Sequence, residues 1–132
     1  MSIRAMHPAV PVLLAVALAA CEQGPVEQVQ TRDVSFKDDV APILQKHCAE
    51  CHLEGGSGST ATGFKVESYA SIMQGSNYGP VIEPGIARTS SLFILISSKD
   101  HLTVSMPRER PPLADEEIET IRAWIDNGAI DN

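Results

Sequence analysis

Residues 48–52 read Cys48-Ala49-Glu50-Cys51-His52, two cysteines separated by two residues and followed directly by a histidine. This spacing allows the two sulfur atoms to bond to the two vinyl groups that lie side by side on the edge of a haem. The histidine is then carried beneath the ring, with its imidazole directed at the iron. The stretch therefore predicts one covalent c-type haem, held by Cys48 and Cys51, with His52 as an axial ligand.

Two other uses of this cysteine pair are open to the sequence. A structural zinc site needs four ligands, and beyond residue 20 the pair could be joined only by His47, His52 and His101. A redox dithiol usually lies in a βαβ context, whereas the apolar pattern here is helical. Haem is the favoured interpretation, and zinc and a redox dithiol are its alternatives.

The sixth iron ligand is predicted from a second short motif, Met106-Pro107. It falls in a Pro-rich loop, and Pro107 disfavours helical geometry at Met106, so that the methionine can reach the far face of the ring. The alternatives are Met73, His101 and an empty site. Met73 lies on a predicted short helix, where a methionine commonly fills the core.

The second ring nitrogen of His52 needs a hydrogen-bond acceptor, and a backbone carbonyl is the usual one. The loop that contains Pro80 and Pro84 is the expected source, unless both prolines only shape turns. Three loop arginines are candidates to pair with haem propionates, because guanidinium groups match carboxylates. The alternative is that they are solvated surface charges. These residues are Arg88, Arg108 and Arg110.

Hydrophobic periodicity predicts a series of short helices after residue 33. In chain order we expect a helix over 36–47, a Gly- and Ser-rich loop over 55–63, a helix over 67–74, a turning segment over 77–88, a helix over 90–97 where a buried strand is the alternative, a Pro-rich loop over 99–112, and a helix from 115 that ends at Gly128. The expected N-caps are Asp38 or Asp39, then Thr89 or Ser90, and Asp115.

The first 20 residues are typical of a secretory signal, with Arg4 and His7 before an apolar run over 9–20 that is too short to span a bilayer. Leu18-Ala19-Ala20-Cys21 resembles the lipobox of bacterial lipoproteins. In that family the chain is cut before the cysteine, which is then lipidated; an ordinary signal with an incidental cysteine is the alternative. Residues 21–33 are polar and predict a flexible tether.

Acidity limits the partners of this chain. The formal net charge of the full chain is −7. Cleavage after residue 20 would remove the positive charge of Arg4 and leave the remaining chain more acidic. Such a balance argues against binding to nucleic acid, whose phosphates attract Lys and Arg. It permits steering towards a basic protein partner.

The whole pattern over about 34–130 resembles a small class I-type cytochrome c domain, in the variant of bacterial lipoprotein and planctomycete-type cytochromes. The resemblance implies an all-α fold of four to five short helices around one covalent haem, with the N- and C-terminal helices packed against each other. It would bring Trp124 and Ile121 against Phe36 and Ile43 or Leu44. It rests on Phe36, Val40, Pro42-Ile43-Leu44, the motif at 48–52, Tyr69, Gly75, Pro84-Gly85, Ser91-Leu92, Met106-Pro107, residues 113–118, Trp124-Ile125 and Gly128-Ala129.

The expected organisation is a lipoprotein signal at 1–20, a tether at 21–33 with lipidated Cys21, and a cytochrome c domain at 34–132. Because histidine and methionine fill both axial positions, we expect an electron carrier and no enzyme, serving a redox protein on the periplasmic side of a bacterial membrane. Glu22 favours the outer membrane, since it is not the usual inner-membrane retention residue of such lipoproteins. A gas-binding or sensing haem with an open sixth site is the alternative.

Overall fold

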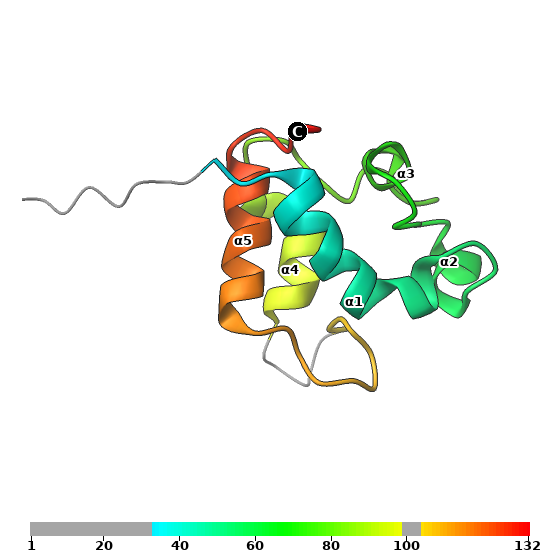
Figure 1. Cartoon of the computed structure of the whole chain (residues 1–132). Coiled ribbons are helices and arrows are strands. Elements are labelled where there is room, and N and C mark those ends of the chain that lie inside the picture. Colours follow the sequence, from blue (N-terminus) through cyan, green and yellow to red (C-terminus); the bar gives the residue numbers. More distant parts are fainter. Residues whose placement is uncertain (1–32, 99–103) are drawn as a thin grey trace, which may run out of the picture. The chain divides into compact units, whose positions relative to one another are not determined.

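The computed structural model describes residues 33–98 and 104–132. The predicted signal at 1–20, Cys21 with almost all of the tether, and His101 lie outside these residues. The described part is helical and contains no β-strand, which confirms the expected all-α class (Figure 1). None of its helices combines the length and the apolar character needed to cross a bilayer. The elements are η1 (Phe36–Val40), α1 (Ala41–His52), α2 (Ser57–Thr62), α3 (Tyr69–Gln74), η2 (Ala87–Thr89), α4 (Ser91–Ser97) and α5 (Asp115–Asp126).

The first helix is longer than predicted, because it continues through the cysteine motif to His52. It starts as a π-helical turn, η1, and Pro42 then falls in the first turn of α1, where its missing N–H costs little. The expected caps Asp38 and Asp39 are wrong. Ser35 is the N-cap, and its hydroxyl accepts from the Asp38 amide at 3.2 Å.

Residues 57–62 form the short helix α2, so the prediction of a loop over 55–63 was wrong. The buried Ser59 hydroxyl donates to the carbonyls of Leu53 and Gly56 and ties the helix to the end of α1. Gly63, with φ of 75°, ends it in the left-handed conformation that glycine adopts without strain. Tertiary bonds therefore stabilise a helix that composition alone disfavours.

The next two helices agree with the sequence in type and differ at their ends. Helix α3 starts at Tyr69, two residues later than predicted, after a capping box between Ser68 and Ser71. Residues 91–97 are helical, as favoured over a strand. Ser90 is the N-cap of α4, but its fully buried hydroxyl bonds to backbone groups of Glu83 and Ile86 instead of the helix.

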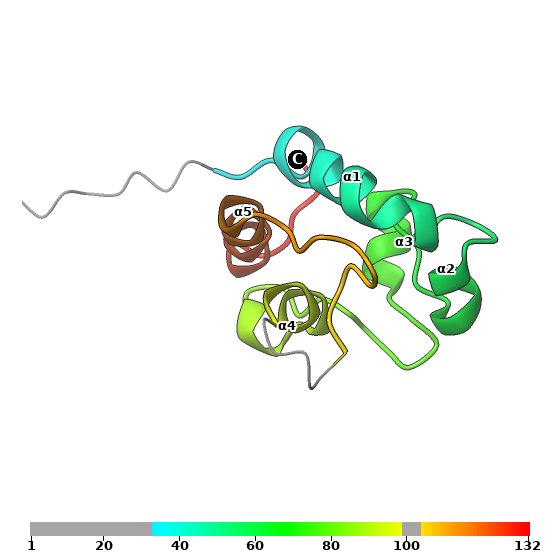
Figure 2. The same cartoon turned by 90° about the horizontal axis from the view of Figure 1, so that it is seen from below.

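Helix α5 packs against η1, so the N- and C-terminal helices meet as expected (Figures 1 and 2). The rings of Phe36 and Trp124 lie 5.4 Å apart, and Tyr69 adds an edge contact to Phe36 at 5.2 Å. The predicted cap Asp115 is instead the first helical residue. Ala114 is the N-cap, and its amide donates to the Glu117 carboxylate.

Candidate functional site

Cys48, Cys51 and His52 lie together at the C-terminal end of α1. Both cysteines are free thiols and half-buried. Three residues along an α-helix place two side chains on the same face, one turn apart. The helix therefore presents the two thiols side by side with His52 directly after them, which is the arrangement that a covalently held haem needs.

His52 is oriented through its Nδ1 atom, which lies 3.0 Å from the carbonyl oxygen of Phe64. This carbonyl, and not one from the loop around Pro80 and Pro84, is the acceptor, so that expectation was wrong. The Nδ1 atom must donate to a carbonyl, which leaves the lone pair on Nε2 available to a metal. The buried ring of Phe64 also contacts the imidazole edge-on at 5.3 Å.

The acceptor carbonyl is held in place because residues 64–66 run along the end of α1. The Val66 amide donates to the His52 carbonyl at 3.0 Å. The side chain of Gln45, two turns earlier on α1, donates to the Val66 carbonyl at 3.0 Å. These bonds fix the segment that carries Phe64, and so the acceptor, relative to the imidazole.

The backbone of α2 also lies close to the same imidazole. A Cβ atom placed on Gly58 would lie 2.7 Å from both Cε1 and Nε2 of His52. Such a distance is far inside van der Waals contact, so only a glycine allows the backbone this close. Gly58 is therefore part of the site, although its side chain supplies no chemistry.

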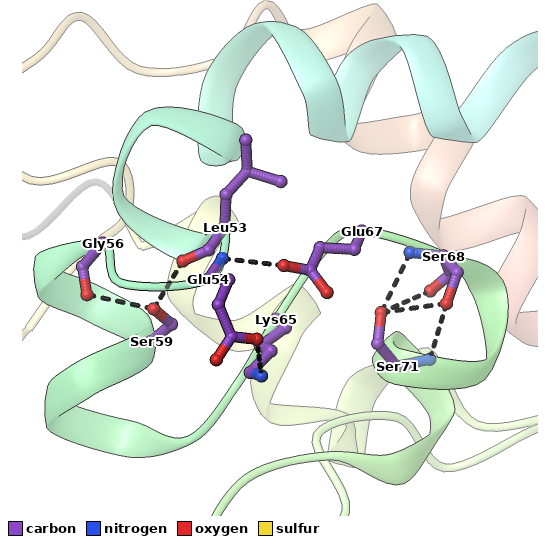
Figure 3. Close-up of polar contacts among 8 residues, drawn as sticks. All are labelled: Leu53, Glu54, Gly56, Ser59, Lys65, Glu67, Ser68 and Ser71. Carbon is purple, nitrogen blue, oxygen red and sulfur yellow. Dashed lines mark hydrogen bonds and ion pairs between the residues drawn. The ribbon is translucent and has the colours of Figure 1, made fainter.

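A polar network fixes the segment that follows the motif (Figure 3). The Glu54 amide donates to the Glu67 carboxylate at 2.7 Å, and Lys65 pairs with the Glu54 carboxylate. These contacts join the turn after α1 to the stretch that carries Phe64. They hold residues 53–67 as one folded lobe beside His52.

Met106 lies on the segment 104–114, half-buried and packed against the core. Its amide donates to the Leu95 carbonyl of α4 at 2.9 Å. A cavity of about 860 Å³ opens between this segment and the ends of α4 and α5, and Met106 lines it. Met73, the alternative ligand on α3, is also half-buried and packed against the core.

The motif residues of α1 do not line that cavity, but the two predicted parts of the site are linked by charge. The Arg110 Nη1 atom lies 2.7 Å from a carboxylate oxygen of Glu50, a residue between Cys48 and Cys51. Figure 2 shows the segment passing between α1 and α4. Arg110, considered as a propionate partner, is thus engaged with Glu50.

The Cys48 thiol is not activated as a nucleophile. Burial raises the pKa of this thiol to about 11, although the Arg110 charge opposes the change. Catalytic dithiols depend on a depressed pKa, because the thiolate is the reactive form. The environment of Cys48 disfavours the redox-dithiol interpretation and suits a sulfur that remains in one covalent bond.

Residues 48–109, from the first cysteine to just beyond Met106-Pro107, match the family model described as Planctomycete cytochrome C. This match is consistent with a cytochrome c-type domain. Such a domain implies a c-type haem and, in general terms, haem-based electron transfer. Neither the curated proteins nor the solved structures gave a match.

The residues of the cytochrome c domain fit the implied haem. The two thiols are unpaired, and the His52 Nε2 atom makes no hydrogen bond within residues 33–98 and 104–132. Sequence reasoning missed Phe64 and Gly58. The Phe64 contribution is a backbone carbonyl, which any residue could supply, and Gly58 was hidden in a stretch that was interpreted as a loop.

Proposed function

We propose that this chain is a membrane-tethered periplasmic electron carrier with one c-type haem, bound through Cys48 and Cys51 and ligated by His52 and Met106. The observation that carries the proposal is the bond from His52 Nδ1 to the Phe64 carbonyl, beside two unpaired thiols in a segment of cytochrome c type. In an imidazole fixed in this way, Nδ1 is held by its hydrogen bond and Nε2 is left to bind iron.

When bound, the haem supplies a reversible one-electron change at its iron. The chain would supply the surroundings: Cys48 and Cys51 would hold the haem through thioether bonds, the Phe64 carbonyl would keep His52 in one tautomer, and His52 and Met106 would bind the iron. A thioether favours ferrous iron and so raises the potential relative to two nitrogen ligands. With both positions filled, dioxygen and substrates have no open site, which favours electron transfer over catalysis.

The proposed location rests on the N-terminal sequence. A short signal followed by Leu18-Ala19-Ala20-Cys21 supports a lipid anchor on Cys21. A polar stretch to residue 33 would let the domain reach a redox protein in the periplasm. Glu22 supports the outer membrane. The partner we propose has a basic surface, because the chain carries an excess of acidic residues.

Absorption spectra and the mass of protein matured with a working haem-ligation system test this function. We expect the mass of one added haem, and in the oxidised protein the weak far-red band of a methionine–iron(III) bond. A mass equal to the bare polypeptide would overturn the proposal. A haem without that band, which binds carbon monoxide, would favour the gas-binding alternative.

A Met106→Ala substitution identifies the sixth ligand. We expect loss of the far-red band, a lower reduction potential and binding of carbon monoxide, because the thioether no longer fills the axial position. Met73→Ala is the matched control, a half-buried methionine on α3. If Met73→Ala abolished the band and Met106→Ala preserved it, the ligand would be reassigned.

A further inference from the structure

The segment 104–114 is anchored to three helices, and two of its anchors are charges with no role in binding the haem itself. Its amide at Met106 bonds to α4. Arg110 bonds to Glu50 of α1 at 2.7 Å. At its end, the Ala114 amide donates to Glu117 of α5 at 3.0 Å.

Glu117 also connects the end of this segment to α1, the helix that carries the cysteine motif. Its carboxylate accepts from Lys46 Nζ at 2.8 Å and lies 3.0 Å from Nε2 of His47, the residue before Cys48. The Glu117 and His47 side chains are only 19% and 14% exposed, so solvent screens this contact less than the surface pair of Arg110 and Glu50. One carboxylate thus joins α1, α5 and the end of the Met106 segment.

We propose that Glu117 and Arg110 are positioning residues that hold Met106 at its distance from the haem-binding end of α1, an inference that rests on the proposed His52 and Met106 ligation. Both residues act on the separation between the Met106 segment and α1. Their contacts with the segment lie after Met106 in the sequence. Glu117 fixes where the segment enters α5, and Arg110 fixes its middle to Glu50, between the two cysteines. Neither side chain is itself one of the proposed haem ligands.

Imidazole binding to the oxidised holoprotein measures this positioning, since exogenous imidazole reaches the iron only when methionine leaves it. The Lys46–Glu117 and Arg110–Glu50 pairs each include a solvent-exposed partner, and such pairs contribute up to about 1 kcal/mol, so Glu117→Gln and Arg110→Gln should each tighten the apparent imidazole affinity by about two- to fivefold. Glu119→Gln is the control on α5, because Glu119 pairs only along that helix with Arg122 in the described contacts.

A charge swap separates positioning from general stability. The double variant Glu50→Arg with Arg110→Glu should return the imidazole affinity towards the wild-type value, whereas each single reversal should tighten it. Variants that lower the melting temperature but bind imidazole like the control would overturn the inference alone. Absence of the far-red methionine band in the wild-type protein would overturn the proposed ligation, and this inference with it.

Discussion

At the scale of single residues, two backbone contacts position His52, in addition to the edge contact with the Phe64 ring. The Phe64 carbonyl accepts from Nδ1, and the Gly58 backbone lies close to the imidazole ring. Held in this way, the imidazole would keep one orientation in both oxidation states of a bound iron. Small reorganisation of this kind is what an electron carrier requires.

A Gly58→Ala substitution should disturb this arrangement. Alanine in a helix normally gains up to about 1 kcal/mol over glycine, but overpacking a tight contact costs about 1–3 kcal/mol, and here the new methyl would lie 2.7 Å from two imidazole atoms. We therefore expect net destabilisation and an altered reduction potential. Thermal unfolding and potentiometry of the holoprotein check this, with the exposed Thr60→Ala on the same helix as control. A more stable Gly58→Ala protein with an unchanged potential would contradict it.

The residues of the site differ in how far the sequence could predict them. Cys48, Cys51 and His52 form a motif whose spacing carries its own chemical reason, so the order of residues along the chain is enough to select them. Met106 was selected for the proline that follows it, and its role is still a prediction. Phe64 and Gly58 could not be found, because a carbonyl and a missing Cβ leave no chemical signature in a sequence.

At the scale of elements, Glu117 makes the packing of α1 and α5 sensitive to acid. Hydrogen bonds from Lys46 above all, with help from Ala114 and His47, lower the pKa of this carboxyl from 4.5 to about 2. A lowered pKa in the folded state stabilises the fold above pH 4.5, and the contribution is lost as the pH falls towards 2. The ionised carboxylate is the form that joins the two helices.

The stability difference between wild type and Glu117→Gln should therefore depend on pH. We expect the variant to melt at a lower temperature at pH 7 and the two melting curves to converge as the pH falls from 4.5 towards 2, where wild-type Glu117 also becomes neutral. Melting of both holoproteins, followed by circular dichroism across this range, is the measurement. A difference in melting temperature that stays constant down to pH 2 would refute the assigned charge effect.

Helix α2 shows why one element could not be predicted from the sequence. Its sequence, Ser57-Gly58-Ser59-Thr60-Ala61-Thr62, has weak helix propensity and no apolar period. The helix forms because Ser59 bonds to the end of α1 and because its backbone packs on His52. The strongly periodic α5 was predicted nearly to the residue, since its core contacts recur every turn.

Removal of the Ser59 hydroxyl tests whether a tertiary bond stabilises this helix. Ser59→Ala should lower the free energy of unfolding by about 1 kcal/mol, because the Leu53 and Gly56 carbonyls lose a buried donor. The exposed Ser57→Ala on the same helix should change it much less. Chemical denaturation of the two variants gives the comparison, and equal effects would show that the bond to α1 is not what stabilises α2.

At the scale of the whole molecule, the domain has many short helices and a small interior. Helices α2, α3 and α4 have six or seven residues each, and isolated helices shorter than about 12 residues are not stable in water. Asn132 joins the residues after α5 to the start of η1, because it accepts from the Ser35 hydroxyl and from the amides of Phe36 and Lys37. This closure joins η1 to the residues after α5, whereas the lobe around His52 depends on its own bonds to α1.

The weak independent support of the lobe around His52 predicts that the protein without haem is largely unfolded. A domain of about 100 residues buries little apolar surface of its own, and a covalent apolar ring beside Cys48, Cys51 and His52 would add interior next to these residues. A Cys48→Ala, Cys51→Ala variant, which cannot attach haem, should show weak helical circular dichroism and no cooperative melting, whereas the holoprotein should show both. Cooperative melting with holoprotein-like helical content in that variant would mean that the helices of this chain build a sufficient core without the cofactor.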